Sequence, residues 1–251
     1  MSILNYLSKR RPAFAVLIDP DNFKEDFYKE TLKQLQVSHV DLVLVGGSTL
    51  THGHLDEIIL EIKSHVHVPV VLFPGNTYQL SKEADGILFL SLISGRNPEY
   101  LIGKQVEAAP LIQESGIEVI GTGYILIEGG KLGAISYLTQ TIPIPRDQHQ
   151  LIAQTALAGE MMGMQAMYIE SGSGARNHAS SQSIREIKNR CSSTLFVGGG
   201  ISTPDQITHL AEAGADVIVV GTAIEHHPPS MPSLGKVIFD YRKQEWTRVS
   251  S

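Results

Sequence analysis

The sequence predicts an α/β protein of the (β/α)8 TIM-barrel class, formed by a single domain over residues 1–251. Its 251 residues and 42% hydrophobic content fit the size and core of one such barrel. Eight short apolar runs alternate with seven helix-like stretches, and the runs are near-continuous, as in parallel strands covered on both faces. Two glycine clusters near the C-terminus also stand at strand ends, where barrels of this class usually bind phosphate.

The predicted strands are short runs rich in valine, isoleucine and leucine. They cover residues 13–18, 40–45, 68–73, 86–90, 119–127, 166–169, 195–197 and 217–220. The helix-like stretches cover residues 25–36, 55–65, 98–115, 148–162, 181–190, 203–213 and 233–248. Between the third and fourth strands, residues 76–85 are too few for a crossover helix with its turns. The third helix of the barrel is therefore expected to be missing or reduced, which leaves that side less covered.

The segment after the fifth strand is an elaborated loop. Its Glu128-Gly129-Gly130-Lys131 turn is followed by residues 132–138, which we expect to form the return strand of a hairpin. Residues 141–145 contain two prolines and are expected to be extended, because proline fixes its own φ and keeps its predecessor out of the helical region. The loop is either a lid over the carboxyl ends of the strands or a plain structural connector.

Composition argues against several classes of protein. The formal charge of −6, without a block of basic residues, argues against a nucleic-acid binder. Cys191 is the sole cysteine, so neither an internal disulfide nor a cysteine-based zinc site is possible. The histidines lack the helical pair spacing of a metal site. No apolar run approaches the roughly 20 residues of a membrane-spanning helix, so we expect a soluble, cytoplasmic protein.

The two C-terminal glycine clusters predict a phosphate-binding clamp. Gly199 and Gly200 follow the seventh strand, and Gly221 and Thr222 follow the eighth, with one helix between them. Glycine frees backbone N–H groups from side chains, and N–H groups gathered at strand ends and helix N-termini bind a phosphate dianion without lysine. An anionic ligand is thus expected to be held locally by these loops.

Two further strand ends carry candidate metal ligands. Asp19 follows the first strand, on the side of a barrel where active sites form, and its carboxylate suits Mg²⁺, which takes one or two carboxylates together with substrate phosphates. Ser48 follows the glycine pair after the second strand and is a candidate for the same metal shell. A structural alternative stays open, since Asp19, Asp21 and Ser48 are also suited to cap the helices that follow.

The end of the sixth strand carries the most specific of these patterns. Glu170 brings a carboxylate to the active face, and residues 171–174 are serines and glycines whose backbone can closely approach a polyol phosphate. A carboxylate there can orient a hydroxyl group or accept its proton. The alternative is structural, with Glu170 satisfied by the serine-rich turn beside it.

Together these motifs resemble the geranylgeranylglyceryl phosphate synthase family, including its bacterial relatives that transfer other prenyl chains. The resemblance follows chain order through residues 17–21, 45–48, 73–76, 123–125, 141–147, 156–160, 168–175, 197–201 and 214–222. It implies a modified barrel that lacks its third helix, in agreement with the short connection noted above. It also implies a Mg²⁺-dependent enzyme that transfers a prenyl group, geranylgeranyl by preference, from its diphosphate to the C3 hydroxyl of sn-glycerol 1-phosphate, giving an ether-linked prenylglyceryl phosphate.

The resemblance also implies roles for residues. Glu170 would align the attacking hydroxyl and take its proton, and Asp19 would act in catalysis by holding Mg²⁺ together with Ser48. The prenyl tail is expected in an apolar groove on the less covered side, near Phe73 and Tyr124. The residues implied to surround the glycerol are Tyr168, Ile169, Glu170, Ser171, Gly172, Ser173 and Gly174, and those implied to hold its phosphate are Gly199, Gly200, Gly221 and Thr222.

The sequence departs from the family's pattern at two places. Many relatives carry a lysine after the first-strand motif, whereas Asn22 and Phe23 stand here, so that positive charge is absent or comes from elsewhere, for instance from Lys24. Residues 176–178 replace a more apolar segment. Contacts to the diphosphate at these two places therefore differ from the family's pattern.

Two other functions stay open from the residues alone. They are a phosphate-sugar isomerase or lyase on the same scaffold, and a non-catalytic protein that binds a phosphate ligand. A Schiff-base lyase would require a strand-end lysine, and the predicted strands provide none. The expected partners are the two substrates, with no nucleic acid. We also expect homo-oligomers that associate through residues 98–115 or 151–162, and peripheral membrane contact through the lipid product.

Overall fold

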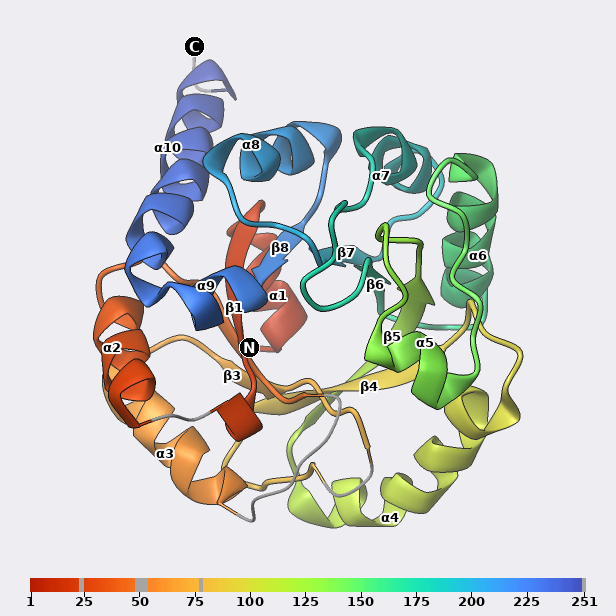
Figure 1. Cartoon of the computed structure of the whole chain (residues 1–251), viewed down its shortest axis with the longest axis horizontal. Helices are drawn as coiled ribbons and strands as arrows, with labels where there is room; N and C mark the ends of the chain where they lie inside the picture. Colours follow the sequence, from red (N-terminus) through yellow and green to blue (C-terminus); the bar gives the residue numbers. More distant parts are fainter. Residues whose placement is uncertain (23–24, 48–53, 77–78, 250–251) are drawn as a thin grey trace.

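Eight parallel strands close into a barrel, with helices arranged around it (Figure 1). The structure, a computed structural model, describes residues 1–22, 25–47, 54–76 and 79–249. Each strand pairs with the next, and β8 pairs with β1 through a parallel register that joins Ala13 to Val217 and Val16 to Val220. The predicted fold class is therefore confirmed.

All eight strands lie where the apolar runs predict them, with ends that shift by a few residues. They are β1 Ala13–Ile18, β2 Leu42–Val45, β3 Val70–Leu72, β4 Gly86–Leu92, β5 Glu118–Leu126, β6 Ala166–Glu170, β7 Thr194–Gly198 and β8 Val217–Val220. The runs are easy to locate because both faces of each strand are buried, so that almost every position is apolar.

The long helices are also where the sequence predicts them. They are α2 Glu25–Leu35, α3 Leu55–His65, α4 Lys104–Ser115, α6 His149–Met161, α7 Ser181–Lys188, α8 Pro204–Ala213 and α10 Met231–Val249, with a π-helical turn η2 Glu99–Gly103 before α4. Three short helices, α1 Ile3–Ser8, α5 Ala134–Thr139 and α9 Thr222–His226, and the 3-10 turns η1 Pro20–Asn22 and η3 Pro228–Ser230, were not predicted. Among the helices of these described ranges, none has the length and apolar character needed to cross a membrane.

The connection between β3 and β4 contains no helix in its described residues, 73–76 and 79–85. The expected loss of the third barrel helix is confirmed for that part of the connection. In Figure 1, α3 and α4 are consecutive on the outer ring, and the β3–β4 connection passes between them. The outer face of β4 on this side is therefore covered by α4 and by loops.

Residues 132–138 do not form the return strand that the sequence analysis predicts; most of them belong to α5. The reason is topological, because β5 is already paired with β4 on one side and β6 on the other. A closed barrel leaves no free strand edge for a hairpin partner. The extended segment 141–145 is as expected, and Ile144 forms an isolated parallel bridge with Ile127 just beyond β5.

Side chains that point alternately to the two faces of each strand form two separate hydrophobic clusters. Tyr168 and Phe196 belong to the cluster that fills the barrel, whereas Ile169 and Val197 belong to the cluster between the strands and the helices. Consecutive strand residues point to opposite faces, so each strand supplies both clusters. The short helix α1 adds the buried Ile3 and Leu7 to the inner cluster, behind the barrel mouth in the view of Figure 1.

A buried carboxylate joins β7, α7 and the start of β8. Asp216 is 4% exposed and accepts a hydrogen bond of 2.8 Å from the Leu195 N–H. Lys188 Nζ and Arg11 Nε lie 2.6 Å and 3.0 Å from its two carboxylate oxygens. This cluster lies at the amino-terminal ends of the strands, where residues of a barrel serve stability rather than chemistry.

Replacing Asp216 with alanine is expected to lower the free energy of unfolding by about 2–4 kcal/mol, because it leaves a buried N–H and two cations without their acceptor. Urea denaturation measures the loss. Asp240→Ala, which removes an exposed partner of Lys236 on α10, is the matched control and is expected to change stability by less than about 0.5 kcal/mol. Equal losses in the two variants would contradict this account.

Candidate active site

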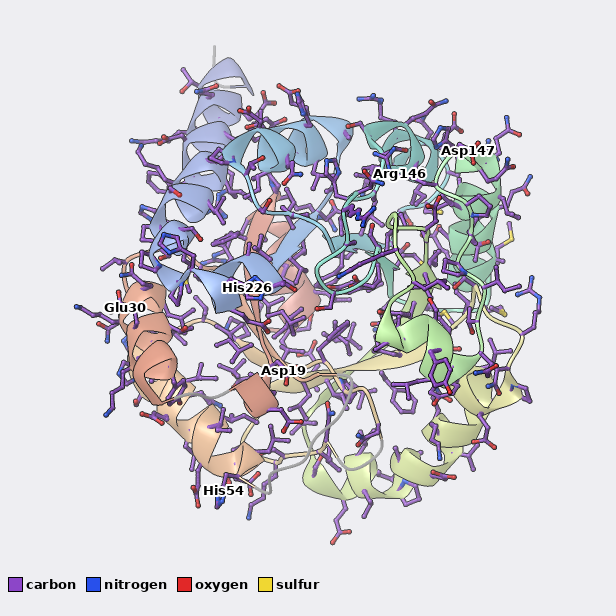
Figure 2. All side chains as sticks on the ribbon, viewed as in Figure 1. Asp19, Glu30, His54, Arg146, Asp147 and His226 are labelled. Carbon is purple, nitrogen blue, oxygen red and sulfur yellow. The ribbon has the colours of Figure 1, made fainter. Side chains whose placement is uncertain are left out.

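A cavity of about 500 Å³ opens at the carboxyl ends of the strands. One part is polar and is lined by Asp19, Glu170 and the glycine loops that follow β6, β7 and β8. The other part is apolar and continues toward α4. Figure 2 shows Asp19 and His226 over the mouth of the barrel, from the segments that follow β1 and β8. The arrangement is typical of barrel active sites, which are built from the loops after the strands.

Glu170 is the buried acid of this cavity. It ends β6, is 7% exposed, and its Oε1 accepts a 2.5 Å hydrogen bond from the Gly172 N–H. Burial raises the pKa of Glu170 to about 7, against the opposing effect of the hydrogen bond from Gly172. A carboxyl group with a pKa near neutrality is suited to exchange a proton with a ligand hydroxyl.

The carboxylate of Glu170 lies directly against the backbone after β7. A Cβ on Gly199 would approach Glu170 Oε1 to 2.4 Å and the Gly172 nitrogen to 2.8 Å. Only glycine fits there, and its φ of 83° is also one that other residues rarely adopt. Gly199 therefore allows the Glu170 carboxylate to lie in direct contact with the loop that follows β7.

An aromatic stack forms the floor beneath Glu170. Tyr168 lies between Phe73 and Phe196, with ring centroids 4.8 Å and 6.0 Å away, and Tyr124 lies 5.6 Å from it. Burial and then the neighbouring Glu170 raise the pKa of both tyrosines well above the ordinary value, so both hydroxyls stay protonated. Tyr168 Oη is buried without a hydrogen-bond partner among the described residues, which leaves it available to a ligand.

The predicted phosphate clamp is assembled from three loops. Thr222 Oγ1 accepts a hydrogen bond of 3.1 Å from the Gly174 N–H and lies 3.0 Å from Ser173 Oγ. Gly200 packs so closely on the chain at Asn177 that a Cβ would approach it to 2.9 Å. The first N–H groups of a helix have no acceptor within it, and α9 begins here at Thr222. The loops after β6, β7 and β8 therefore meet at the place where the sequence predicts a phosphate.

Asp19 lines the same cavity after β1, the strand that pairs with β8. Its carboxylate occupies the space that a Cβ on Gly47 would need, at a distance of 2.5 Å. Its Oδ1 accepts a hydrogen bond of 3.0 Å from the Asp21 N–H, and burial raises its pKa. Both interpretations of Asp19 thus have support, because it stabilises the local turn and also faces the cavity.

The other proposed metal ligand, Ser48, lies outside the described residues. No group of three or more histidine, cysteine or acidic side chains that could hold a metal ion occurs in the described ranges. A metal in this cavity would therefore depend on few protein ligands and on oxygens of a substrate, as Mg²⁺ often does.

Gln79 is a residue that sequence reasoning missed. It is 2% exposed, and its Oε1 accepts hydrogen bonds from the N–H groups of Gly47 and Gly75, at 3.3 Å and 3.0 Å. Its Nε2 donates to the Gly47 carbonyl at 2.8 Å. The side chain thus fixes the loop after β2 to the loop after β3. No local pattern marks it, because its role depends on a partner far away in the sequence.

The structure brings most of the predicted site residues into this one cavity. Those that line it are Asp19, Tyr168, Glu170, Gly172, Ser173, Gly174, Gly199, Gly200, Gly221 and Thr222. The prediction is wrong for the side chain of Ile169, which points outward into the helix-facing cluster because strand residues alternate. Ser171 is 3% exposed and is not among the lining residues, and its Oγ has no partner among the described residues.

The apolar part of the cavity forms a groove on the side of the β3–β4 connection, where residues 73–76 and 79–85 contain no helix. Phe73 and Tyr124 stand at its start, as the sequence analysis expects, and Ala108 and Ile112 of α4 line it further along. Ile87, which belongs to the outer cluster, also lines it. The groove therefore leaves the barrel mouth and continues between the outer face of β4 and α4, lined by apolar side chains.

The chain is similar in sequence and fold to one set of known proteins. It matches the PcrB family over residues 5–236. It is 42% identical over 244 residues to a geranylgeranylglyceryl phosphate synthase of Spirosoma linguale, covering 97% of this chain and 98% of that protein. It is 43% identical over 224 residues to one of Chitinophaga pinensis, covering 89% of each.

A solved structure agrees with these relatives. The crystal structure of (S)-3-O-geranylgeranylglyceryl phosphate synthase from Thermoplasma acidophilum, in complex with its substrate sn-glycerol-1-phosphate, has a TM-score of 0.87 to this chain. The two are 31% identical, and the match covers 94% of this chain and 96% of that one. The resemblance inferred from the motifs is confirmed.

Glu170→Gln is expected to stabilise the protein above neutral pH. The folded chain keeps the Glu170 proton up to pH about 7, whereas the unfolded chain releases it near the ordinary value of 4.5. The stability of the wild type should therefore fall relative to the variant across this window, by up to about 3 kcal/mol. Urea denaturation from pH 4 to 8 measures the difference, and parallel curves would contradict a raised pKa.

Proposed function

The chain belongs to the PcrB family, and on that premise we propose that it is a prenyltransferase acting on sn-glycerol 1-phosphate. The prenyl group, geranylgeranyl by preference, is transferred from its diphosphate to the C3 hydroxyl, giving an ether-linked prenylglyceryl phosphate and diphosphate. The observation that carries the proposal is a single cavity in which a clamp of backbone donors and a long apolar groove meet at Glu170. A small phosphate ester and a prenyl chain fit these two parts respectively.

In this reaction the glycerol phosphate occupies the polar part of the cavity. Its phosphate lies among the N–H groups near Gly199, Gly200 and Gly221, and Thr222 adds a hydroxyl. The glycerol then lies toward Tyr168 and Glu170, which line this part of the cavity. This orientation presents the hydroxyl farthest from the phosphate to the start of the groove.

The protein contributes positioning and proton transfer to the chemical step. The bond between prenyl C1 and the diphosphate oxygen breaks, and the glycerol C3 oxygen forms a new bond to that carbon. The proton of the hydroxyl passes to the Glu170 carboxylate, whose pKa near 7 suits it to accept that proton. The aromatic rings of Tyr124 and Tyr168 lie beside the reacting carbon, and a π-face stabilises nearby positive charge.

The diphosphate is the part of the substrate for which Mg²⁺ is proposed. Asp19 suits that ion, because it offers hard oxygen ligands at the mouth of the cavity, next to the backbone of Gly47. A bound Mg²⁺ would supply charge neutralisation for the leaving diphosphate. Ser48 is a second proposed ligand from the adjacent loop.

The alternative of a Schiff-base lyase is disfavoured by the lysine that lines the cavity. Lys104 Nζ lies 3.0 Å from Glu107, and this pairing raises its pKa. A Schiff-base lysine requires the opposite shift, since the neutral amine is the nucleophile.

Association of copies and contact with a membrane are further parts of the proposal. Val106 and Leu111 of α4 and Leu151 and Met161 of α6 are exposed apolar side chains on the helices for which association is predicted. Covering such side chains is favourable in an oligomer. A product with a long prenyl chain would be released to a lipid surface.

Product analysis tests the proposed reaction directly. The protein with Mg²⁺ is incubated with prenyl diphosphates from C10 to C35 and with each enantiomer of glycerol phosphate, and products are identified by mass spectrometry. We expect the ether product with sn-glycerol 1-phosphate and greatest turnover for C20, and Glu170→Ala should remove most of that turnover while the protein remains folded. Phosphate binding without any product would identify a binding protein instead.

Asp19→Asn is expected to raise the Mg²⁺ concentration that gives half-maximal rate by roughly tenfold or more, because a neutral amide is a much weaker ligand for Mg²⁺ than a carboxylate. Turnover is measured over a Mg²⁺ titration. Asp21→Asn is the matched control, because Asp21 is close in sequence but is not among the residues lining the cavity. Identical titrations for wild type and Asp19→Asn would assign Asp19 to stabilising the turn.

A further inference from the structure

The loop between β5 and α5 is fastened to the loop that follows β6. The Gly129 carbonyl accepts hydrogen bonds from the N–H groups of Arg176 and Asn177, at 2.9 Å and 3.0 Å. A Cβ on Gly129 would lie 2.1 Å from the Ser171 carbonyl oxygen, and one on Gly130 would lie 2.7 Å from Asn177 Nδ2. The two glycines are therefore required for this contact, and the position of the next residue is fixed by it.

That next residue is Lys131, and its ammonium group reaches the phosphate clamp. Lys131 Nζ lies 3.2 Å from the place that a Cβ on Gly174 would take, and Thr222 Cγ2 lies 3.6 Å from the same place. Gly174 and Thr222, joined by the hydrogen bond from the Gly174 N–H to Thr222 Oγ1, form one side of the predicted clamp. The ammonium forms no ion pair with a carboxylate in the ranges that the structure describes.

We propose that Lys131 is a substrate-binding residue that pairs with the phosphate group of the glycerol phosphate. This inference deepens the proposed function and rests on it. The clamp otherwise consists of neutral N–H and hydroxyl donors, whereas its ligand is a dianion at neutral pH. A cation at the edge of the clamp strengthens binding through a charge-assisted hydrogen bond, and a lysine can reach a phosphate oxygen from several directions.

The lysine that lines the cavity, Lys104, does not meet this need. Lys104 is paired with Glu107 and Glu99 on its own side of the molecule, and it belongs to α4 beside the apolar groove. Lys131 thus supplies, next to Gly174, a positive charge that is not already neutralised by a neighbouring carboxylate. Its β5–α5 loop then serves as more than a connector, since it carries a ligand-binding group.

Calorimetric binding of inorganic phosphate and of sn-glycerol 1-phosphate to the full chain, without prenyl diphosphate, tests this role. Lys131→Met is expected to weaken both affinities by roughly five- to tenfold, whereas Lys131→Arg should restore most of the binding. Lys33→Met is the matched control, because it removes the same charge from an exposed position on α2, which is not one of the clamp loops. It should change either affinity by less than about twofold.

Steady-state kinetics give a second readout. Lys131→Met should raise KM for glycerol phosphate by a similar factor and leave kcat within about twofold, because the charge acts on bound substrate and transition state alike. Affinities for Lys131→Met equal to those of Lys33→Met would overturn the inference, as would a loss of kcat without a change in affinity. Circular dichroism confirms that each variant is folded, and Lys131→Gln repeats the test with a polar side chain.

The failure of this inference differs from the failure of the proposed function. If Thr222→Val weakens phosphate binding while Lys131→Met does not, the clamp is correct and the assignment of Lys131 is wrong. If the wild type binds neither inorganic phosphate nor sn-glycerol 1-phosphate, the proposed function fails and this inference fails with it.

Discussion

Closure of the barrel is the constraint on which the rest of the structure depends. The pairing of β8 with β1 brings the carboxyl ends of all eight strands to one rim. Asp19 after β1 and Thr222 after β8 come from opposite ends of the chain, yet they line the same cavity for this reason. The same closure removes every free strand edge, so the segment after β5 folds as α5 instead of adding a strand.

The β3–β4 connection, whose described residues contain no helix, leaves this rim with a cavity that has a polar part and an apolar part. A complete ring of helices would cover the outer faces of the strands, but on this side the cavity continues between β4 and α4. A polar clamp and an apolar groove therefore share one opening. Glu170 stands where they meet, and its burial at the end of β6 is what raises its pKa. Glu170 therefore lowers the free energy of unfolding, because burying a carboxyl group is unfavourable.

Close backbone contacts arrange the loops of the rim. Gly199 admits the Glu170 carboxylate, Gly47 admits that of Asp19, and Gly129 admits the Ser171 carbonyl. In each case a Cβ would occupy the space of a polar group on another loop. Gln79 adds a side-chain link between the loops after β2 and β3. The glycines at strand ends thus allow neighbouring loops to approach one another closely.

The sequence by itself determined the fold class, the eight strands, the long helices and the strand ends that carry chemistry, because these depend on local periodicity and on residue type. It also placed Glu170, Asp19 and the clamp glycines at the correct ends of their strands. Only the tertiary structure decided that residues 132–138 are mostly helical, that the side chain of Ile169 points away from the cavity, and that Gln79 and Lys131 reach other loops. Those outcomes depend on contacts between segments far apart in the chain, and such contacts leave no periodic pattern in the sequence.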